Sequence, residues 1–408
     1  MRRHIARHLL ALVLSSGFVA VQPAPAVAYP STNGALVFES DRTRTTDLFA
    51  VTAAGADPTN LTSTSGADEY DPAVSPDGTR IVFGRRDRSE RRRADLFVAG
   101  LGGGGRTRLT STAPPERHPA WSPDGTRIAY TARTSSGGSF RLFSVNADGR
   151  GRTQLTTQPG DSYDMYPAWS PDGTRIAFVT NRDGGFPEIY VIDADGTGRR
   201  RLTENTQIDT APAWSPDGTR IVFARCCANG SFDLFTMNAD GTGQARLTTS
   251  DAQESDPAWS PDGATIAFVS FPPGGGNVDV WTIDADGTDP KRITNAEAVD
   301  LAPSWQPEPV CTITGSTGAD KLAGTEASDV ICGFEGDDVV EAGDGADLVI
   351  AGPGDDQVDG NGGNDLLFGS SGADVMNGRA GYDGLFGGGG IDTCRRGAEG
   401  AFLRQCEA

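Results

Sequence analysis

The chain has 408 residues, and its 55 acidic and 35 basic side chains give a formal net charge of −20. The acidic excess is concentrated after residue 310. This balance argues against nucleic acid as a partner and favours cations or basic surfaces. Of the three histidines, only His118 lies beyond the first eight residues, so a metal site built from several histidines is excluded there.

Residues 1–28 have the pattern of a secretory signal peptide. Three arginines come first, the apolar run Leu9 to Val21 follows, and Ala26-Val27-Ala28 provides a small-residue cleavage site. The apolar run is too short to span a bilayer, and no cysteine near the cleavage point could accept a lipid. We therefore expect an exported protein, extracellular or associated with the cell envelope, that does not span the membrane.

A repeat with the consensus Pro-Ala-Trp-Ser-Pro-Asp-Gly organises most of the chain. Its copies begin at Pro72, Pro119, Pro167, Pro212 and Pro257, with a truncated sixth copy at Pro303. They are 45 to 48 residues apart, a period typical of propellers or helical arrays. Short alternating runs such as Arg-Ile-Ala-Phe and Gly-rich turns predict four strands in each repeat rather than helices.

The two ends of this region complement each other. The earliest strands, 35–39, 47–51 and 60–62, have no Pro-Ala-Trp strand before them, whereas the strand at 303–305 has no partner strands after it. Together they complete one blade, which closes the ring and leaves no free sheet edge. The sequence therefore predicts six blades.

These motifs resemble those of TolB-like β-propellers, over roughly residues 33–307. The resemblance implies a six-bladed propeller over residues 29–307. It also implies a partner at the channel mouth, either an extracellular or envelope protein or another ligand.

A carboxylate stands three residues before the repeat's proline in every blade. The six residues are Glu69, Glu116, Asp164, Asp209, Glu254 and Asp300. Because first strands line a propeller's channel, we expect these side chains to form a ring at one mouth. Two interpretations remain open: each carboxylate accepts hydrogen bonds from backbone N–H groups in the turn between blades, or the ring binds a cation or a basic, amine-bearing partner.

Catalysis has little support in the sequence. No Gly-x-Ser-x-Gly nucleophile motif occurs, and His118, beside Glu116, is better explained by packing or partner contact. We therefore expect no enzymatic activity. The alternative, a secreted hydrolase or lyase acting on a cell-wall or plant polysaccharide in the channel, would need Glu116, His118 or Asp164 for activity.

After a linker predicted at 308–314, the composition changes to a nine-residue period. The repeated aspartates are Asp320, Asp329, Asp338, Asp347, Asp356, Asp365, Asp374, Asp383 and Asp392. A large apolar residue usually follows each aspartate by two positions, and Gly precedes it by two at every position except Ala327. This is the nonapeptide pattern Gly-Gly-x-Gly-x-Asp-x-U-x, where U is apolar.

Eighteen residues complete one coil of a parallel β-roll, so aspartates 18 apart stack along one edge, about 4.8 Å from each other. Carboxylates from two stacked turns, with backbone carbonyls between them, supply the oxygen ligands that Ca²⁺ prefers. Up to seven such sites fit between the nine aspartates.

The repeats resemble the RTX, or haemolysin-type, calcium-binding repeats, which implies a β-roll with a C-terminal cap over residues 315–408. The first units are imperfect, because Ser316 and Thr325 replace Gly, so sites at Asp320 and Asp329 are doubtful; Cys394 occupies the last apolar position. Without Ca²⁺ the acidic, Gly-rich segment should be disordered.

Six cysteines fit an exported protein. Cys311 with Cys332, and Cys394 with Cys406, bracket the two ends of the predicted roll and are candidate disulfides. The adjacent Cys226 and Cys227 could form a vicinal disulfide, pair elsewhere or stay reduced.

The sequence thus predicts an all-β, two-part, secreted calcium-binding protein: a six-bladed propeller that serves as a binding scaffold, and a parallel β-roll that folds on Ca²⁺. A further alternative makes the roll the functional part, attaching the protein to the cell surface through Ca²⁺.

Overall fold

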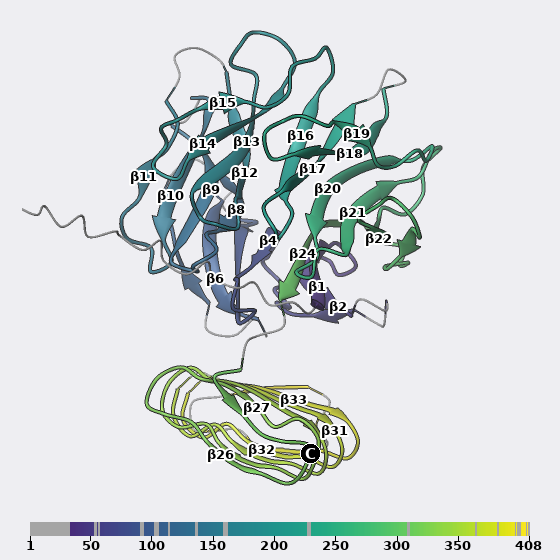
Figure 1. Cartoon of the computed structure of the whole chain (residues 1–408). Coiled ribbons are helices and arrows are strands. Elements are labelled where there is room, and N and C mark those ends of the chain that lie inside the picture. Colours follow the sequence, from purple (N-terminus) through teal and green to yellow (C-terminus); the bar gives the residue numbers. More distant parts are fainter. Residues whose placement is uncertain are drawn as a thin grey trace, which may run out of the picture.

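A computed structural model describes residues 33–406, except 53–54, 56–57, 90–93, 102–105, 113–114, 135–137, 158–161, 227–229, 308–310, 364, 382, 396, 398–400 and 405. The predicted signal peptide, residues 1–28, and Cys227 lie outside the described residues. The described residues form strands and turns without a helix, so none of them forms a helix that is long and apolar enough to cross a membrane. Six four-stranded sheets form a propeller, and two parallel sheets form a separate roll below it (Figure 1).

Each blade is an antiparallel sheet whose four strands follow one another from the channel outward. The first contains β24 (Asp300–Pro307), β1 (Asn33–Ser40), β2 (Asp47–Val51) and β3 (Thr59–Asn60). The second contains β4 (Ala67–Val74), β5 (Arg80–Asp87), β6 (Asp95–Gly100) and β7 (Thr107–Arg108). The third contains β8 (Glu116–Trp121), β9 (Arg127–Arg133), β10 (Phe140–Asn146) and β11 (Thr153–Gln154). The fourth contains β12 (Asp164–Trp169), β13 (Arg175–Thr180), β14 (Glu188–Asp193) and β15 (Arg200–Arg201). The fifth contains β16 (Asp209–Trp214), β17 (Arg220–Cys226), β18 (Phe232–Asn238) and β19 (Ala245–Arg246). The sixth contains β20 (Gln253–Trp259), β21 (Thr265–Phe271), β22 (Asp279–Asp284) and β23 (Lys291–Arg292).

The first blade closes the ring with strands from both ends of the propeller, which confirms the shared blade predicted from the sequence. Strand β24 pairs with β1, with Trp305 opposite Leu36. Arg42, just after β1, donates two hydrogen bonds to the buried carboxylate of Asp300 at 2.8 and 2.9 Å. Closure therefore rests on a sheet ladder and on an ion pair, both of which join residues far apart in the chain.

The propeller core lies between neighbouring blades. Second strands are buried on both faces, because each blade packs against a neighbour on either side, and Phe38, Phe83, Phe178 and Phe223 are fully buried there. Each such side chain contributes about 1.5–3 kcal/mol when removed from water. The repeat's tryptophan joins two blades, since Trp121 Nε1 donates to the Ala73 carbonyl at 3.0 Å. These contacts explain why the apolar periodicity, repeated per blade, is sufficient to specify the ring.

The roll consists of two parallel sheets whose strands alternate along the chain. The six-stranded sheet contains β25 (Ile313–Thr314), β27 (Val330–Cys332), β29 (Leu348–Pro353), β31 (Leu366–Ser371), β33 (Asp383–Gly389) and β35 (Ala401–Arg404). The five-stranded sheet contains β26 (Lys321–Ala323), β28 (Val339–Glu341), β30 (Gln357–Asp359), β32 (Val375–Asn377) and β34 (Thr393–Arg395). Pairing is in steps of eighteen residues, as with Val349 opposite Leu367. The predicted fold class, a six-bladed propeller followed by a parallel β-roll, is confirmed.

The apolar residue of each nonapeptide points into the roll, where Val349, Leu367, Met376 and Leu385 are fully buried. The turns are too tight for side chains at several glycines. At Gly352, for example, φ is +111° and an added Cβ would lie 1.8 Å from the Phe334 carbonyl oxygen.

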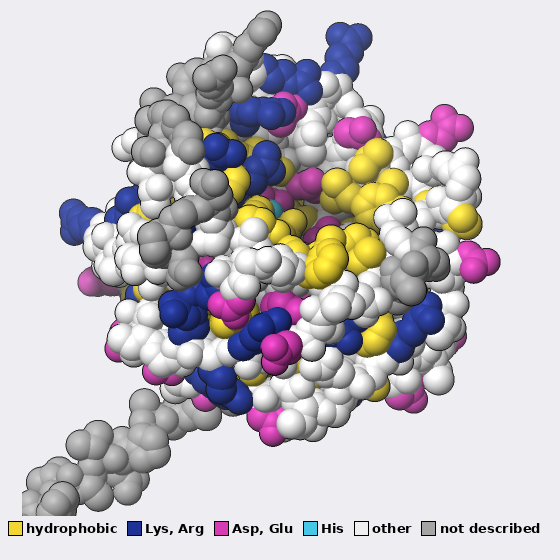
Figure 2. Space-filling model, turned by 90° about the horizontal axis from the view of Figure 1, so that it is seen from above, with side chains coloured by type: hydrophobic (Ala, Val, Ile, Leu, Met, Phe, Trp, Pro, Cys, Tyr) yellow, Lys and Arg dark blue, Asp and Glu magenta, His cyan; other side chains and the backbone are white. Residues whose placement is uncertain are grey.

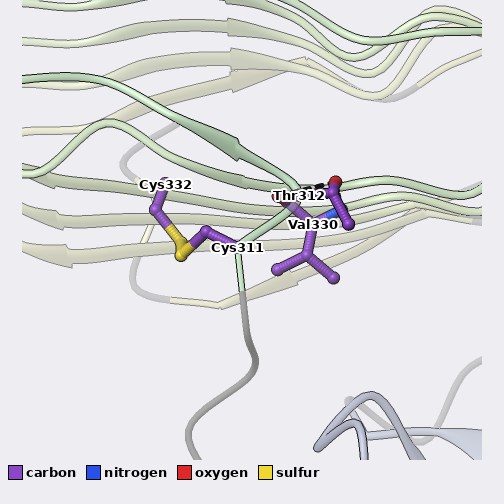
Figure 3. Close-up of a disulfide and its surroundings, with 4 residues drawn as sticks. All are labelled: Cys311, Thr312, Val330 and Cys332. Atoms are coloured by element: carbon purple, nitrogen blue, oxygen red, sulfur yellow. Dashed lines mark hydrogen bonds between the residues drawn. A yellow bond between two sulfur atoms is a disulfide. The ribbon is translucent and has the colours of Figure 1, made fainter. Parts of the chain in front are cut away.

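The expected disulfides Cys311–Cys332 and Cys394–Cys406 are both present. The first ties the chain to β27 where it enters the roll from the propeller (Figure 3). Cys226 ends β17, and because Cys227 is outside the described residues, the state of this adjacent pair stays open.

Candidate functional site

The six carboxylates predicted to ring the channel mouth are buried side chains. Exposure is 3% for Glu254 and 0% for the other five. Each aspartate faces an arginine of its own blade, in the pairs Asp164–Arg182, Asp209–Arg225 and Asp300–Arg42. Glu116 accepts from Thr110 and Thr112, Glu254 accepts from Thr248 and Ser250, and Glu69 lies 3.7 Å from Arg106. Burial raises the pKa of all three glutamates.

These partners are side chains, whereas the first interpretation of the sequence expected backbone N–H groups. The six carboxylates are absent from the lining of the channel cavity. Their role in binding a partner therefore stays a prediction, and the structure places other residues in direct contact with the cavity.

The channel cavity has a volume of about 390 Å³ and is lined by the residue that precedes each repeat proline. These residues are Asp71, His118, Tyr166, Ala211, Asp256 and Ala302, and their φ angles are all between 49° and 55°. In each of the six inner strands the register shifts at this point, so one extra residue bulges out of the ladder. A bulge redirects a side chain, and here it turns six side chains toward the channel axis. The face opposite the roll has a central hollow that contains acidic and histidine side chains (Figure 2).

Three carboxylates and two rings form the polar part of this cavity. Glu39 from β1 joins Asp71 and Asp256, and its Oε2 accepts a hydrogen bond from the Asp71 backbone N–H at 2.7 Å. The rings of His118 and Tyr166 stack with centroids 4.0 Å apart. Among the described residues, the buried His118 Nδ1 has no hydrogen-bond partner. Arg117 also lines the cavity, but its guanidinium lies over the Tyr70 ring, 4.9 Å from the centroid.

Burial in the cavity shifts the pKa values of the titratable groups that line it. Burial, reinforced by the charge of Asp71, raises the pKa of Glu39 to about 8 and that of Asp256 to about 6. Burial also lowers the pKa of His118, so its imidazole is neutral near pH 7. Near pH 7 the Glu39 carboxyl is therefore mostly protonated, whereas that of Asp256, with a pKa of about 6, is mostly ionised.

The residues that line the cavity lie two positions after the predicted carboxylates, and the sequence did not indicate them because alternation and the usual extended conformation before proline give no sign of a bulge. One signal was available for Glu39. The matching position of the other blades holds Gly84, Thr131, Val179, Ala224 and Val269, so a charged residue there is exceptional.

In the roll, seven aspartates share one arrangement. They are Asp338, Asp347, Asp356, Asp365, Asp374, Asp383 and Asp392, each at most 2% exposed. In each, Oδ1 accepts the backbone N–H of the aspartate eighteen residues earlier, as from Asp338 to Asp356 at 2.8 Å. The second oxygen, Oδ2, is buried and has no hydrogen-bond donor among the described residues. Burial raises the pKa of Asp365 to about 7 and the pKa values of Asp347 and Asp356 to about 6.

The first two aspartates differ. Asp320 Oδ2 accepts from the Ser316 backbone N–H at 2.6 Å, and Asp329 Oδ2 accepts from the Thr325 N–H at 2.7 Å. The hydroxyls of Ser316 and Thr325 donate to the same oxygens. These hydrogen bonds lower the pKa of Asp320, and at Asp329 they outweigh burial and lower its pKa too.

Backbone conformation, more than side-chain type, separates the two classes. Four residues before each of the seven aspartates φ is positive, as at Ser370, where it is 83°. Ser316 and Thr325 lack a positive φ, which lets their N–H groups meet the carboxylate. Ser370 has the same side chain as Ser316, yet Asp374 Oδ2 remains without a donor among the described residues.

Buried, unpartnered carboxylate oxygens stacked on two edges fit Ca²⁺, a hard cation that takes oxygen ligands. The described residues contain no cluster of three or more His, Cys, Asp or Glu side chains arranged for a metal. A cation in the roll would therefore be held by two aspartates and by backbone carbonyls of the turns.

A family model described as the TolB beta propeller domain matches residues 25–166 and 162–274. A model of the RTX calcium-binding nonapeptide repeat matches residues 312–333, 333–367 and 359–394. A comparison with curated proteins finds no match.

Several solved structures share the propeller fold. TolB from Acinetobacter baumannii is 21% identical, with 67% of each chain covered and a TM-score of 0.58. Putative TolB from Agrobacterium tumefaciens is 23% identical, covers 67% of this chain and 91% of its own, and has a TM-score of 0.52. A chain of a nidogen/laminin complex is 14% identical, with 67% and 98% covered and a TM-score of 0.54. At these identities the likeness concerns the fold alone.

The family matches assign both halves: the chain belongs to the TolB beta propeller domain family and carries RTX calcium-binding nonapeptide repeats after the propeller.

Proposed function

We propose that this is an exported calcium-binding protein whose roll folds on Ca²⁺ and whose propeller binds the cationic group of a partner in its channel. The seven buried Oδ2 atoms without donors among the described residues carry the proposal. Leaving a buried acceptor unsatisfied costs about 1–3 kcal/mol, and more when it is charged. Divalent cations bound along each edge would remove this cost. The free energy of cation binding would then add to the stability of the folded roll.

The Asp residues proposed as ligands are the seven whose Oδ2 has no donor among the described residues. Asp320 and Asp329 contribute less, because Ser316 and Thr325 already occupy their second oxygen. The expected stoichiometry is therefore about five Ca²⁺ per chain, one between each two of these aspartates that lie eighteen residues apart on the same edge.

For the propeller, the cavity chemistry supports an amine or guanidinium as the bound group. Asp71 and Asp256 supply negative charge and Glu39 adds a third carboxyl group, while the stacked His118 and Tyr166 rings offer an aromatic face. Cations bind favourably over aromatic faces. The six buried carboxylates behind the bulges would then act by holding the inner strands in place, and the residues two positions later would contact the partner.

Export is supported by the signal-like residues 1–28 and by the two disulfides that bracket the roll. A binding rather than catalytic role is supported by the family models, which describe a propeller domain and calcium-binding repeats. Extracellular modules commonly bind Ca²⁺ with Kd values of about 10⁻⁴ to 10⁻³ M, so the roll would fold only after export.

Titration of the full chain with Ca²⁺ tests the proposal for the roll. We expect a gain of far-UV circular dichroism from β-structure near millimolar Ca²⁺, together with about five bound ions by equilibrium dialysis. A chain that binds no Ca²⁺, or whose spectrum does not respond to EGTA, would contradict it.

A short lysine-containing peptide tests the channel. Asp256→Asn should weaken its binding several-fold, whereas the control Asp148→Asn, at an exposed turn, should not. Equal affinity for both variants would place the ligand elsewhere.

A further inference from the structure

The two outer faces of the roll differ in polarity. On the six-stranded sheet, the positions that flank the inward row are apolar: Val330, Leu348, Ile350, Leu366, Phe368 and Phe386. On the five-stranded sheet the matching positions include Glu341, Asp359 and Asn377. The roll's own core is complete without the first set, because it consists of the inward rows.

The apolar face is covered by the propeller. Leu348 is 4% exposed and Leu366 is 9% exposed, although both point away from the roll's interior. They belong to one hydrophobic cluster with Leu61 and Leu101 of the first two blades. Val330, Ile350, Phe368 and Phe386 pack at the edge of this cluster, and the last two stack at 4.7 Å.

We propose that the six-stranded face of the roll is a docking surface whose partner is the adjacent face of the first two blades of the same chain, and that Ca²⁺ controls the docking. The calcium dependence rests on the proposed function, since the apolar rows come into register only when the roll is folded. The docking itself rests on the packing described above.

A short tether favours docking within one chain. Strand β24 ends at Pro307, and Cys311 is already tied to Cys332 in the docking sheet (Figure 3). Three residues lie between Pro307 and Cys311, and the four Cα–Cα steps of an extended chain span at most about 14 Å. The two surfaces therefore meet at a high effective concentration, which makes even a weak contact populated.

The contact is loosely packed, as a reversible one would be. Cavities of about 390 and 490 Å³ lie between the roll and the propeller. Asp77 and Arg80 of the propeller line the larger one together with Asp329, Asp347 and Asp365 of one aspartate edge. Atoms lining a void lose dispersion contacts, so docking is weaker than in a filled interface.

Docking leaves the channel accessible. The roll lies below the propeller in Figure 1, whereas the hollow of the channel opens on the opposite face in Figure 2. Docking of the calcium-loaded roll would thus cover one face of the propeller and leave the channel cavity open on the other face.

The test uses two full-length variants that place the same charge on opposite faces of the roll. Leu348→Asp alters the docking face, and Val375→Asp, at the same nonapeptide position but 38% exposed on the five-stranded sheet, is its control. Both should bind as much Ca²⁺ as the wild type. In Ca²⁺, only Leu348→Asp should increase fluorescence of a hydrophobic dye and lower the propeller's Tm, by about 2–8 °C.

Each outcome is distinct. If the wild type binds no Ca²⁺, the proposed function fails whatever the dye reports. If Ca²⁺ binds and the two variants behave alike, the docking proposal is overturned. If the wild type sediments as a calcium-dependent dimer that Leu348→Asp dissociates, the face serves a second copy and docking within one chain is wrong.

Discussion

Asp356→Asn perturbs a single roll aspartate at the centre of its edge. Asp356 is fully buried, its Oδ1 accepts the Asp338 N–H at 2.8 Å, and its Oδ2 has no donor among the described residues. An asparagine can keep the first hydrogen bond but replaces the anionic oxygen offered to a cation by an amide. The variant should therefore lose at least one bound Ca²⁺.

The magnitude follows from the number of unsatisfied oxygens. At about 1–3 kcal/mol each, seven of them destabilise a metal-free roll by about 7–21 kcal/mol, comparable with the 5–15 kcal/mol that stabilises a typical domain. Losing one such contribution lowers the equilibrium constant for Ca²⁺-driven folding by about 5- to 150-fold.

The matched control is Asp320→Asn on the same edge, where Ser316 already donates to the carboxylate. We expect this variant to keep the wild-type stoichiometry. Bound Ca²⁺ is measured by equilibrium dialysis, and the folding midpoint by far-UV circular dichroism. Equal stoichiometry and midpoints for the two variants would refute the assignment of the cation to the unpartnered oxygens.

Two further predictions concern the propeller. Arg42→Ala leaves Asp300 buried without its ion-pair partner, so ring closure should lose about 3–5 kcal/mol in chemical denaturation. Arg150→Ala, whose side chain is 87% exposed, should change stability by less than about 0.5 kcal/mol, and an equally small effect of Arg42→Ala would show that the ion pair does not hold the ring closed. Glu39→Gln tests the pH dependence. Because the folded-state pKa of Glu39 is raised from 4.5 to about 8 by burial and by Asp71, with Asp256 and Arg117 also facing it, the wild type should lose stability as pH rises from 5 to 8. The variant should lose less over that window in thermal unfolding, and parallel curves would show that Glu39 ionises normally.

The propeller's repeat count, its shared closing blade and the eighteen-residue turn of the roll follow from the sequence alone. They depend on local periodicity, and each repeat needs only its neighbours to bury its apolar residues. Ala35 and Trp305 could be assigned to one blade without coordinates for this reason. The two edges of aspartates were likewise fixed by spacing.

Tertiary structure decided which carboxylates line the channel cavity. The bulge before each proline moved the channel lining from Glu69 and its counterparts to Asp71 and its counterparts, because one extra residue reverses the side-chain direction. Left-handed turns separated Asp374 from Asp320, although each follows a serine at the same distance. The burial of Leu348 depends on a surface nearly three hundred residues earlier in the chain, and no local pattern encodes that contact.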